Sequence, residues 1–390
     1  MTDASPDAAP PLGVPMGVYV HWPYCARICP YCDFNVVRER GRTAEAAALG
    51  EAILADLAGH RALTGPRRLV SVFLGGGTPS LMDPALAARI VETCRSLWTA
   101  EPDLEVTLEA NPTDAETDRF AAFRAAGVDR LSLGLQALDD AALKVLGRNH
   151  DAAAGRRAAE RAAAIFPRLS LDLIYARPGQ TPAAWARELK EAIALGAEHI
   201  SPYQLTIEAG TAFDRAVRRG TLRPPGDEDA AGLYETTQAV LEAAGFTAYE
   251  VSNHARGEAA RSRHNLVYWR GWDYVGAGPG AHGRLTLAGA RFATAAPKGI
   301  GDYLAAVGAA GAGSDRERLD ARDQALERLL MGLRTDEGVA LADLAPLAVP
   351  PERLRDLADL GLVRVTGERL IATAAGRPVL DRLTAEIAGG

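Results

Sequence analysis

The sequence is poor in cysteine, in long apolar runs and in positive charge. Only four of its 390 residues are cysteine, which is too few, in too long a chain, for the disulfide framework of a small secreted domain. No run approaches the ~18 uninterrupted apolar residues of a membrane span. The net charge is −7, so there is no overall basic surface for nucleic acid. These absences predict a globular protein with reduced thiols in the cytoplasm.

The N-terminal residues, MTDASPDAAPPLGVP, also lack the features of a signal peptide, because they have no basic start and no apolar core. Proline, alanine and aspartate dominate them, a composition typical of disorder. We expect residues 1–14 to form a disordered tail. The rest of the chain is too long for one core, which predicts a large domain followed by a smaller one.

Strand-like and helix-like stretches alternate in the first 250 residues. Helix-like patterns such as TAEAAALGEAILADLAGH and DPALAARIVETCRSLW separate the strand-like runs. This alternation predicts right-handed βαβ units and a parallel sheet, either an open partial (β/α)6 barrel or a doubly wound sheet, over residues 15–250. The strand-like runs are residues 16–22, 68–76, 104–110, 130–136, 168–176 and 199–207.

The alternation weakens after residue 250, and we expect residues 251–314 to be a connecting segment. Residues 315–390 contain two short helical patterns followed by a hairpin-like and a helix-like stretch, which indicates a small winged-helix-like α+β module. This module holds 11 arginines and 14 acidic residues. Its net charge of −3 has the wrong sign for phosphate contact, so we interpret the module as a lid, docking or dimer surface and expect no nucleic acid partner.

Polar residues interrupt several predicted strands near their C-terminal ends. They include Glu109, Gln136 and Asp172, and the segment Gly75-Gly76-Gly77-Thr78-Pro79 occupies the same position in the second strand. In parallel α/β folds the ligand site lies at this end of the sheet. The placement predicts one site to which many strands contribute.

Three of the four cysteines, Cys25, Cys29 and Cys32, lie within eight residues directly after the first predicted strand. Soft thiolate ligands select iron–sulfur clusters, zinc or copper(I). A structural zinc site normally closes four ligands, and no second cysteine pair exists here. Cys94 lies in an amphipathic pattern typical of a buried, inert thiol. Three corners of one iron–sulfur cube are the favoured interpretation, with one iron left open; a zinc loop and accidental clustering are the alternatives.

Together, VYVHWPYCARICPYCDFN and the strand-end GGGTP make the chain resemble the radical S-adenosylmethionine (SAM) proteins. YVHWPYC, LEANP, LGLQ, LGRNH and HNLVYW resemble, more narrowly, the HemW-type heme chaperones, relatives of the oxygen-independent coproporphyrinogen III oxidases (HemN). The resemblance extends from Tyr19 to the C-terminal module. It implies a partial (β/α)6 radical SAM barrel with a HemN-like module over residues 315–390, and a [4Fe–4S] cluster on Cys25, Cys29 and Cys32.

The resemblance also implies roles for strand-end residues. Gly76, Gly77 and Thr78 match the segment that meets the SAM amino group, and Tyr19 and Glu109 match further SAM contacts. Gln136, Arg148 and Asp172 match residues that the oxidases use for a second SAM. The alternative for these three is an internal polar network, because a carboxylate such as Asp172 between two leucines needs a partner, for example Arg148.

Two departures separate the chain from the oxidases, which carry a fourth cysteine where Phe34 stands and have a longer N-terminal extension. Both weigh against oxidase activity.

His264 in HNLVYW is a candidate heme ligand, with Tyr268 and Trp269 to cover a porphyrin face and a local excess of arginine for the propionates. The alternative is a packed or capping histidine.

The sequence therefore favours a heme chaperone that uses a [4Fe–4S] cluster, SAM and heme. Its expected partners are an electron donor for the cluster and an apo-hemoprotein recipient, with membrane-associated proteins of the respiratory chain among the candidates. The alternatives are coproporphyrinogen III oxidase and an assembly factor that binds SAM but no tetrapyrrole.

Overall fold

Seven parallel strands form the centre of the chain in this computed structural model, which describes residues 13 and 15–389. Six of them are the predicted strands, and they lie side by side in chain order. The predicted disordered tail, residues 1–14, falls outside the described residues except for Gly13. The six strands are β1 (Pro15–Trp22), β4 (Arg68–Gly76), β5 (Thr99–Ala110), β6 (Arg130–Gln136), β7 (Arg168–Tyr175) and β8 (His199–Gln204).

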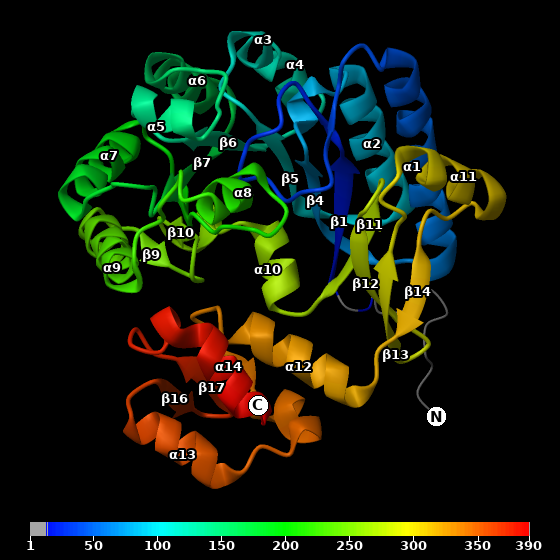
Figure 1. The fold of residues 1–390 in the computed structure, drawn as a ribbon. Helices are drawn as coiled ribbons and strands as arrows, with labels where there is room; N and C mark the ends of the chain where they lie inside the picture. Colours follow the sequence, from blue (N-terminus) through cyan, green and yellow to red (C-terminus); the bar gives the residue numbers. More distant parts are fainter. Residues whose placement is uncertain (1–12, 14, 390) are drawn as a thin grey trace, which may run out of the picture.

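Helices follow these strands and cover the outside of the sheet (Figure 1). Local sequence explains where two of them begin: Asp83 accepts a hydrogen bond from the Ala85 N–H ahead of α2, and Thr181 accepts one from the Ala184 N–H ahead of α7. The helices are α1 (Thr43–Thr64), α2 (Pro84–Leu97), α3 (Asp114–Thr117), α4 (Phe120–Ala125), α5 (Asp140–Val145), α6 (Ala152–Ile165), α7 (Pro182–Ala194), α8 (Ala212–Arg218) and α9 (Asp227–Ala243).

The sheet does not close into a full barrel, because β1 and β8 do not pair with each other. Beyond β8 it continues through β10 (His254–Ala255) and β9 (Thr247–Ala248). Beyond β1, the parallel strand β11 (Asp273–Ala277) leads to an antiparallel meander of β12 (His282–Leu287), β13 (Ala290–Ala295) and β14 (Asp315–Arg318). The predicted connecting segment thus contributes strands to the main sheet, and Val275, Ala277 and Leu285 belong to its apolar core.

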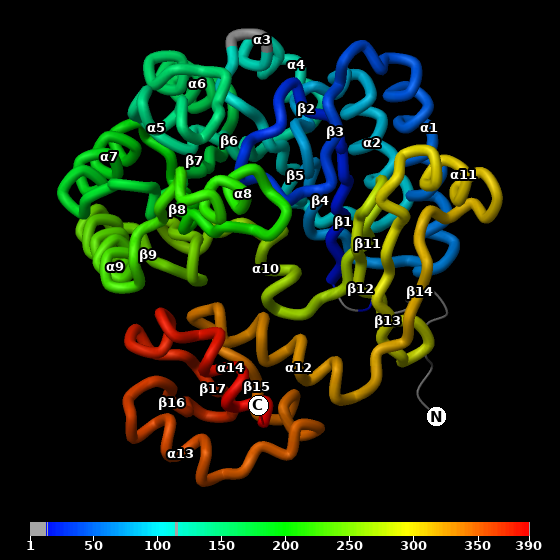
Figure 2. The backbone as a smooth tube through the Cα atoms, viewed as in Figure 1, coloured from blue at the N-terminus to red at the C-terminus, as the bar shows by residue number. Residues whose placement is uncertain are grey.

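The glycine-rich segment VGAGPGAHG spans the turn between β11 and β12. Before it, α10 (Arg263–Trp269) packs against β1, β4 and β11. Between β13 and β14, α11 (Ile300–Ala310) packs on α1. The tube in Figure 2 shows how these late segments return to the N-terminal side of the barrel.

The C-terminal module has its own apolar core, which includes Leu329, Leu357, Leu370 and Leu383. It lies below the barrel in Figure 1. A three-stranded sheet in the order β15 (Val339–Ala340), β17 (Arg369–Ala372), β16 (Val363–Thr366) packs with α12 (Ala321–Gly332), α13 (Pro351–Asp359) and α14 (Leu380–Ala388). The predicted small sheet-and-helix module is confirmed.

Among the described residues, no helix combines the length and the apolarity that crossing a bilayer requires.

Candidate cluster and cofactor site

The three clustered cysteines lie on one loop at the C-terminal end of β1. Cys25 ends the short strand β2 (Tyr24–Cys25), which pairs with β3 (Val37–Arg38), so the residues between them form a loop with fixed ends. Within the loop the Cys32 N–H donates to the Cys29 carbonyl at 3.2 Å. Burial raises the pKa of the Cys25 thiol to about 11 and also raises the pKa of Cys32. These thiols would therefore need a bound cation to become thiolates at neutral pH.

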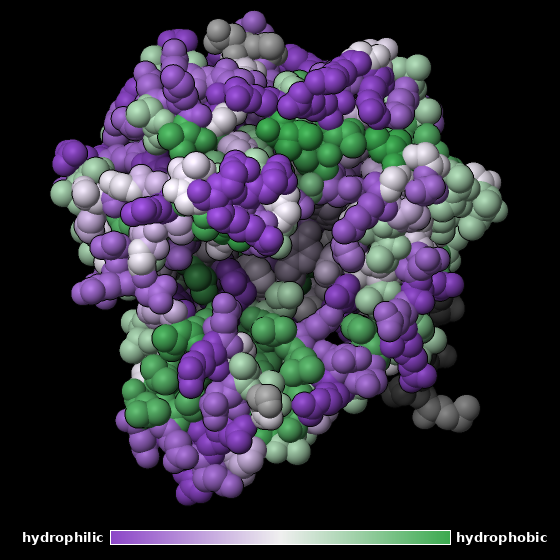
Figure 3. All heavy atoms as spheres, viewed as in Figure 1, coloured by the Kyte–Doolittle hydropathy of each residue, from purple (hydrophilic) through white to green (hydrophobic). Residues whose placement is uncertain are grey.

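The loop opens onto a cavity of about 1180 Å³. The molecule is visibly hollowed between the barrel and the C-terminal module in Figure 3. Ten of the twelve predicted site residues line this cavity, and Tyr19 and His264 do not. The ten are Cys25, Cys29, Cys32, Gly76, Gly77, Thr78, Glu109, Gln136, Arg148 and Asp172.

The glycines at the end of β4 are required by close packing. Gly76 has a φ of +111°, and a Cβ there would lie 2.7 Å from the His21 ring. A Cβ on Gly77 would lie 2.8 Å from the Pro23 carbonyl. The tight turn brings the Thr78 hydroxyl to 3.5 Å from the Cys25 sulfur. It therefore connects the cluster loop to the strand end.

Glu109 sits at the end of the neighbouring strand β5 and accepts a hydrogen bond from the Gly76 N–H at 3.1 Å. Burial, followed by the charge of Asp172, raises the pKa of its carboxyl to about 8. No ion pair to Glu109 is present within the described part of the chain. A cationic ligand in the cavity would supply the missing partner and return the carboxyl to its charged form.

Gln136, Arg148 and Asp172 are neighbours in the cavity wall but do not pair as the sequence suggested. Arg148 donates to the Cys29 sulfur at 3.3 Å, to the Gly134 carbonyl at 3.1 Å and to the Asn111 side-chain oxygen. Asp172 instead accepts hydrogen bonds from Ser132 at 2.8 Å and Ser170 at 3.3 Å. The expected partnership of Asp172 with Arg148 is wrong, because hydroxyls from its own strand β7 and from β6 occupy the carboxylate.

Gln136 has a positive φ of 65°, at the irregularity where β6 shifts its register against β7. A side chain other than glycine in this left-handed region is uncommon, and such strain is frequent at ligand sites. The bulge turns Gln136 into the cavity.

His264 is buried beside the barrel strands, and both of its ring nitrogens have partners. Its Nδ1 lies 2.9 Å from the Ser71 hydroxyl and its Nε2 lies 2.6 Å from the Tyr268 hydroxyl. The ring stacks on Phe73 with centroids 4.9 Å apart. This geometry favours the packing alternative for His264, because no ring nitrogen is free to bind iron. Tyr19 lies beside it, with ring centroids 6.3 Å apart, and its hydroxyl lies 3.0 Å from His21 Nδ1.

The donor set fits an iron–sulfur cube better than a single metal ion. All three thiols face the cavity on one loop, yet no group of three or more His, Cys, Asp or Glu among the described residues is arranged to hold one ion. A cube binds each thiolate to a different iron, so its ligands stand farther apart than those of a tetrahedral zinc. Cys94 is fully buried in α2, as the sequence predicted.

Two parts of the site were missed by sequence reasoning. Asn111, within the LEANP segment, donates to the Thr78 hydroxyl at 3.1 Å and accepts a hydrogen bond from Arg148, so it links Arg148 to the turn after β4. The C-terminal module also lines the cavity through Arg377, Val379 and Arg382 at the start of α14. These residues come more than 300 positions after the cysteines in the sequence. No local sequence pattern could have shown that they line the same cavity.

Comparisons with known proteins agree with this architecture. Residues 19–192 match the Radical SAM superfamily, and residues 319–379 match the HemN C-terminal domain. The Heme chaperone HemW of Mycobacterium tuberculosis is 38% identical over 98% of this chain and 97% of its own length. The mitochondrial Radical S-adenosyl methionine domain-containing protein 1 of Bos taurus is 40% identical over 94% of this chain and 86% of its own.

Among solved structures, the coproporphyrinogen III oxidase HemN of Escherichia coli, a radical SAM enzyme, superposes with a TM-score of 0.79. It covers 96% of this chain and 90% of its own, at 23% identity. This likeness establishes that the two chains share a fold.

Proposed function

Because the chain belongs to the HemW family of radical SAM proteins, we propose that it is a heme chaperone. It holds a [4Fe–4S] cluster on Cys25, Cys29 and Cys32, binds SAM beside the cluster, accepts heme and passes it to an apo-hemoprotein. The observation that carries the proposal is the single cavity lined by the three thiols and the strand-end residues. The cluster, when bound, would supply an iron for the amino acid part of SAM and an electron.

The residues around the cluster loop would bind and orient SAM. The turn at Gly76 and Gly77 allows backbone to approach a ligand closely. Glu109 offers a carboxylate that lacks a cationic partner, which suits the positively charged ammonium or sulfonium of SAM. Arg148 would hold the Cys29 sulfur and Asn111 in place. Tyr19 would act through His21, since it does not line the cavity.

The second candidate function is oxygen-independent coproporphyrinogen III oxidase. One observation favours it: Gln136, Arg148 and Asp172, which match the second-SAM residues of the oxidases, all line the cavity. Phe34 at the position of the oxidases' fourth cysteine weighs against it. The HemW relatives at 38% and 37% identity favour the chaperone.

The test is anaerobic reconstitution of the cluster, followed by heme titration and coproporphyrinogen III turnover on the same preparation. We expect about four irons and four sulfides per chain, a Soret shift on heme addition and no turnover under conditions in which an oxidase works. Turnover without measurable heme binding would make the oxidase the correct function. Tightly bound zinc without sulfide would overturn the cluster itself.

The partners follow from the same proposal. An electron donor would reduce the cluster, and the recipient would be an apo-hemoprotein, with respiratory-chain proteins as the first candidates. The proposed location is the cytoplasm, and the acidic C-terminal module, with 14 acidic residues against 11 arginines, makes nucleic acid an unsuitable partner.

A further inference from the structure

Exposed apolar side chains gather at the opening of the large cavity. Eight large apolar residues are exposed among those that the structure describes, and four of them line this cavity: Ile28, Phe34, Tyr203 and Val379. Phe34 is 62% exposed, the highest value of the four. Single exposed apolar residues are ordinary, but several that line one cavity mark a binding surface. We call these four residues the apolar rim.

The apolar rim comes from three distant parts of the chain. Ile28 and Phe34 lie on the cluster loop, Tyr203 near the end of β8, and Val379 just before α14 of the C-terminal module. Their side chains are left in water by a fold that buries most other large apolar groups. A flat apolar ligand placed between the loop and the module would remove them from water at about 25 cal/mol per Å².

We propose that the apolar rim is the heme site of this protein, with the porphyrin lying between the cluster loop and the start of α14. This inference rests on the proposed function, which supplies the tetrapyrrole as ligand. The cavity volume of about 1180 Å³ exceeds the range of about 300–1,000 Å³ typical of a single drug-sized ligand. The cavity is therefore larger than one such ligand requires.

Two arginines at the opening are available for the heme propionates. Arg27 on the cluster loop and Arg382 on α14 line the cavity, are exposed, and form no hydrogen bond or ion pair within the described residues. Arg334 is already paired with Glu250 at 3.0 Å. The lining also contains the carboxylates of Asp33, Glu208, Asp227 and Asp381, so the position of the propionates is set by the two free guanidinium groups.

The lining contains no histidine and no methionine among the described residues. His254, ten residues before His264, is buried, and its Nε2 lies 3.2 Å from the Gln238 side-chain oxygen. With the three thiols committed to the cluster, the heme iron receives no imidazole or thioether from this chain. Heme held by its faces and propionates can leave without breaking a strong iron–ligand bond, which suits a protein that gives heme away.

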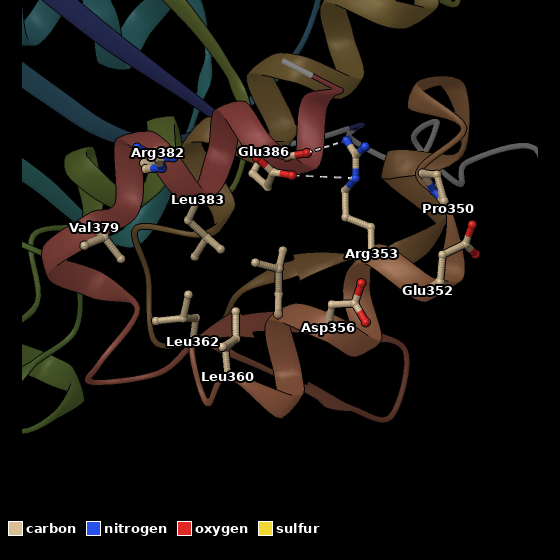
Figure 4. Close-up of a pocket in the computed structure, with 11 residues that line it drawn as sticks. Pro350, Glu352, Arg353, Asp356, Leu360, Leu362, Val379, Arg382, Leu383 and Glu386 are labelled. Atoms are coloured by element: carbon tan, nitrogen blue, oxygen red, sulfur yellow. Dashed lines mark hydrogen bonds and ion pairs between the residues drawn. The ribbon is translucent and has the colours of Figure 1, made fainter.

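One wall of the proposed site belongs to the C-terminal module. Val379 and Arg382 also line a second groove of about 660 Å³ between α13 and α14, with an apolar floor that includes Leu360 and Leu383 (Figure 4). At the other end of this groove, Arg353 lies 4.0 Å from Glu386. The module has a separate apolar core, and ion pairs such as Arg261–Asp336 and Arg284–Glu327 hold it against the rest of the chain.

The test titrates heme into cluster-loaded protein under anaerobic conditions. Phe34→Ser, Val379→Ser and Arg382→Glu should each weaken heme binding about tenfold, because each removes one contact worth on the order of 1.4 kcal/mol. Matched controls are Val365→Ser, which is 49% exposed against 43% for Val379, and Arg355→Glu, an exposed arginine outside both cavities. Both controls should bind heme like the wild type.

Iron and sulfide contents verify that every variant is folded and loaded. The bound ferric heme should give an EPR spectrum without the low-spin signature of histidine ligation. If the wild type binds heme and the three rim variants bind it with the same affinity, the proposed heme site is wrong and the chaperone function stands. An EPR spectrum of histidine-ligated heme would refute the absence of a histidine ligand to the iron. Absence of heme binding in the wild type would instead refute the proposed function.

Discussion

Replacing His264 by alanine separates a structural histidine from a heme ligand. The imidazole fills a buried position and meets the hydroxyls of Ser71 and Tyr268. Its loss leaves two buried hydroxyls without that partner and creates a small cavity. Unsatisfied buried polar groups cost about 1–3 kcal/mol each, and the hydroxyls can relax in part toward each other. We therefore expect a loss of about 3 kcal/mol in the free energy of unfolding at pH 8.

The size of this loss should depend on pH. Burial lowers the pKa of His264 to about 3, and the charge of Arg130 acts in the same direction. The folded wild type keeps this histidine neutral below its ordinary pKa of about 6.5, while the unfolded chain binds the proton. The wild type thus loses about 1.4 kcal/mol per pH unit as the pH falls below 6.5, and the variant does not. The difference between them should shrink to about 1.6 kcal/mol at pH 5.5.

Urea denaturation of cluster-loaded protein at pH 8 and pH 5.5 measures both values. Tyr268→Phe is the control, because it removes only the hydroxyl that meets Nε2 and should cost about 1 kcal/mol. Heme affinity and the Soret band should be unchanged in both variants. A His264→Ala variant as stable as the wild type at pH 8, with a lost or shifted Soret band, would refute the packed histidine and restore it as the iron ligand.

The remaining predictions concern the cluster and SAM. Replacing Cys25, Cys29 or Cys32 by alanine should abolish iron and sulfide uptake, whereas Cys94→Ala should retain the cluster and lose about 1 kcal/mol of stability, because the thiol is buried; equal iron in all four variants would contradict this. In Glu109→Gln, the SAM concentration needed to perturb the EPR spectrum of the reduced cluster should rise about tenfold, while the iron content stays normal. If the SAM titration is unchanged, Glu109 does not contact SAM. The pKa of Glu109 is raised to about 8, so wild-type protein without SAM should become less stable as the pH rises from about 4.5 to 8. The Gln variant should lose less stability, and melting temperatures at pH 6 and pH 9 measure the difference. Gly76→Val should disturb both SAM and cluster binding, since its φ of +111° and the His21 ring exclude a Cβ; near-normal iron in that variant would show that the turn adapts.

Much of the candidate site could be predicted because its signals are local. Cys25, Cys29 and Cys32 share one loop, and Glu109, Gln136 and Asp172 all lie in the C-terminal halves of their strands. Parallel strands bring their carboxyl ends to one edge of a sheet, so an apolar run interrupted by a polar residue near its C-terminal end is enough to place those side chains together. The six central strands were found for the same reason.

The tertiary structure decided what depends on contacts between distant segments. His264 is a packed residue because α10 docks on β4. Its hydrogen-bond partner on that strand, Ser71, lies 193 positions earlier in the sequence. Arg148 forms hydrogen bonds with Cys29 and Asn111, and Asp172 accepts a hydrogen bond from a hydroxyl of the neighbouring strand β6. Val379 and Arg382 reached the cavity only through the placement of the C-terminal module. Sequence periodicity reports which face of an element is buried, but which distant residue meets that face is set by the packing of whole elements.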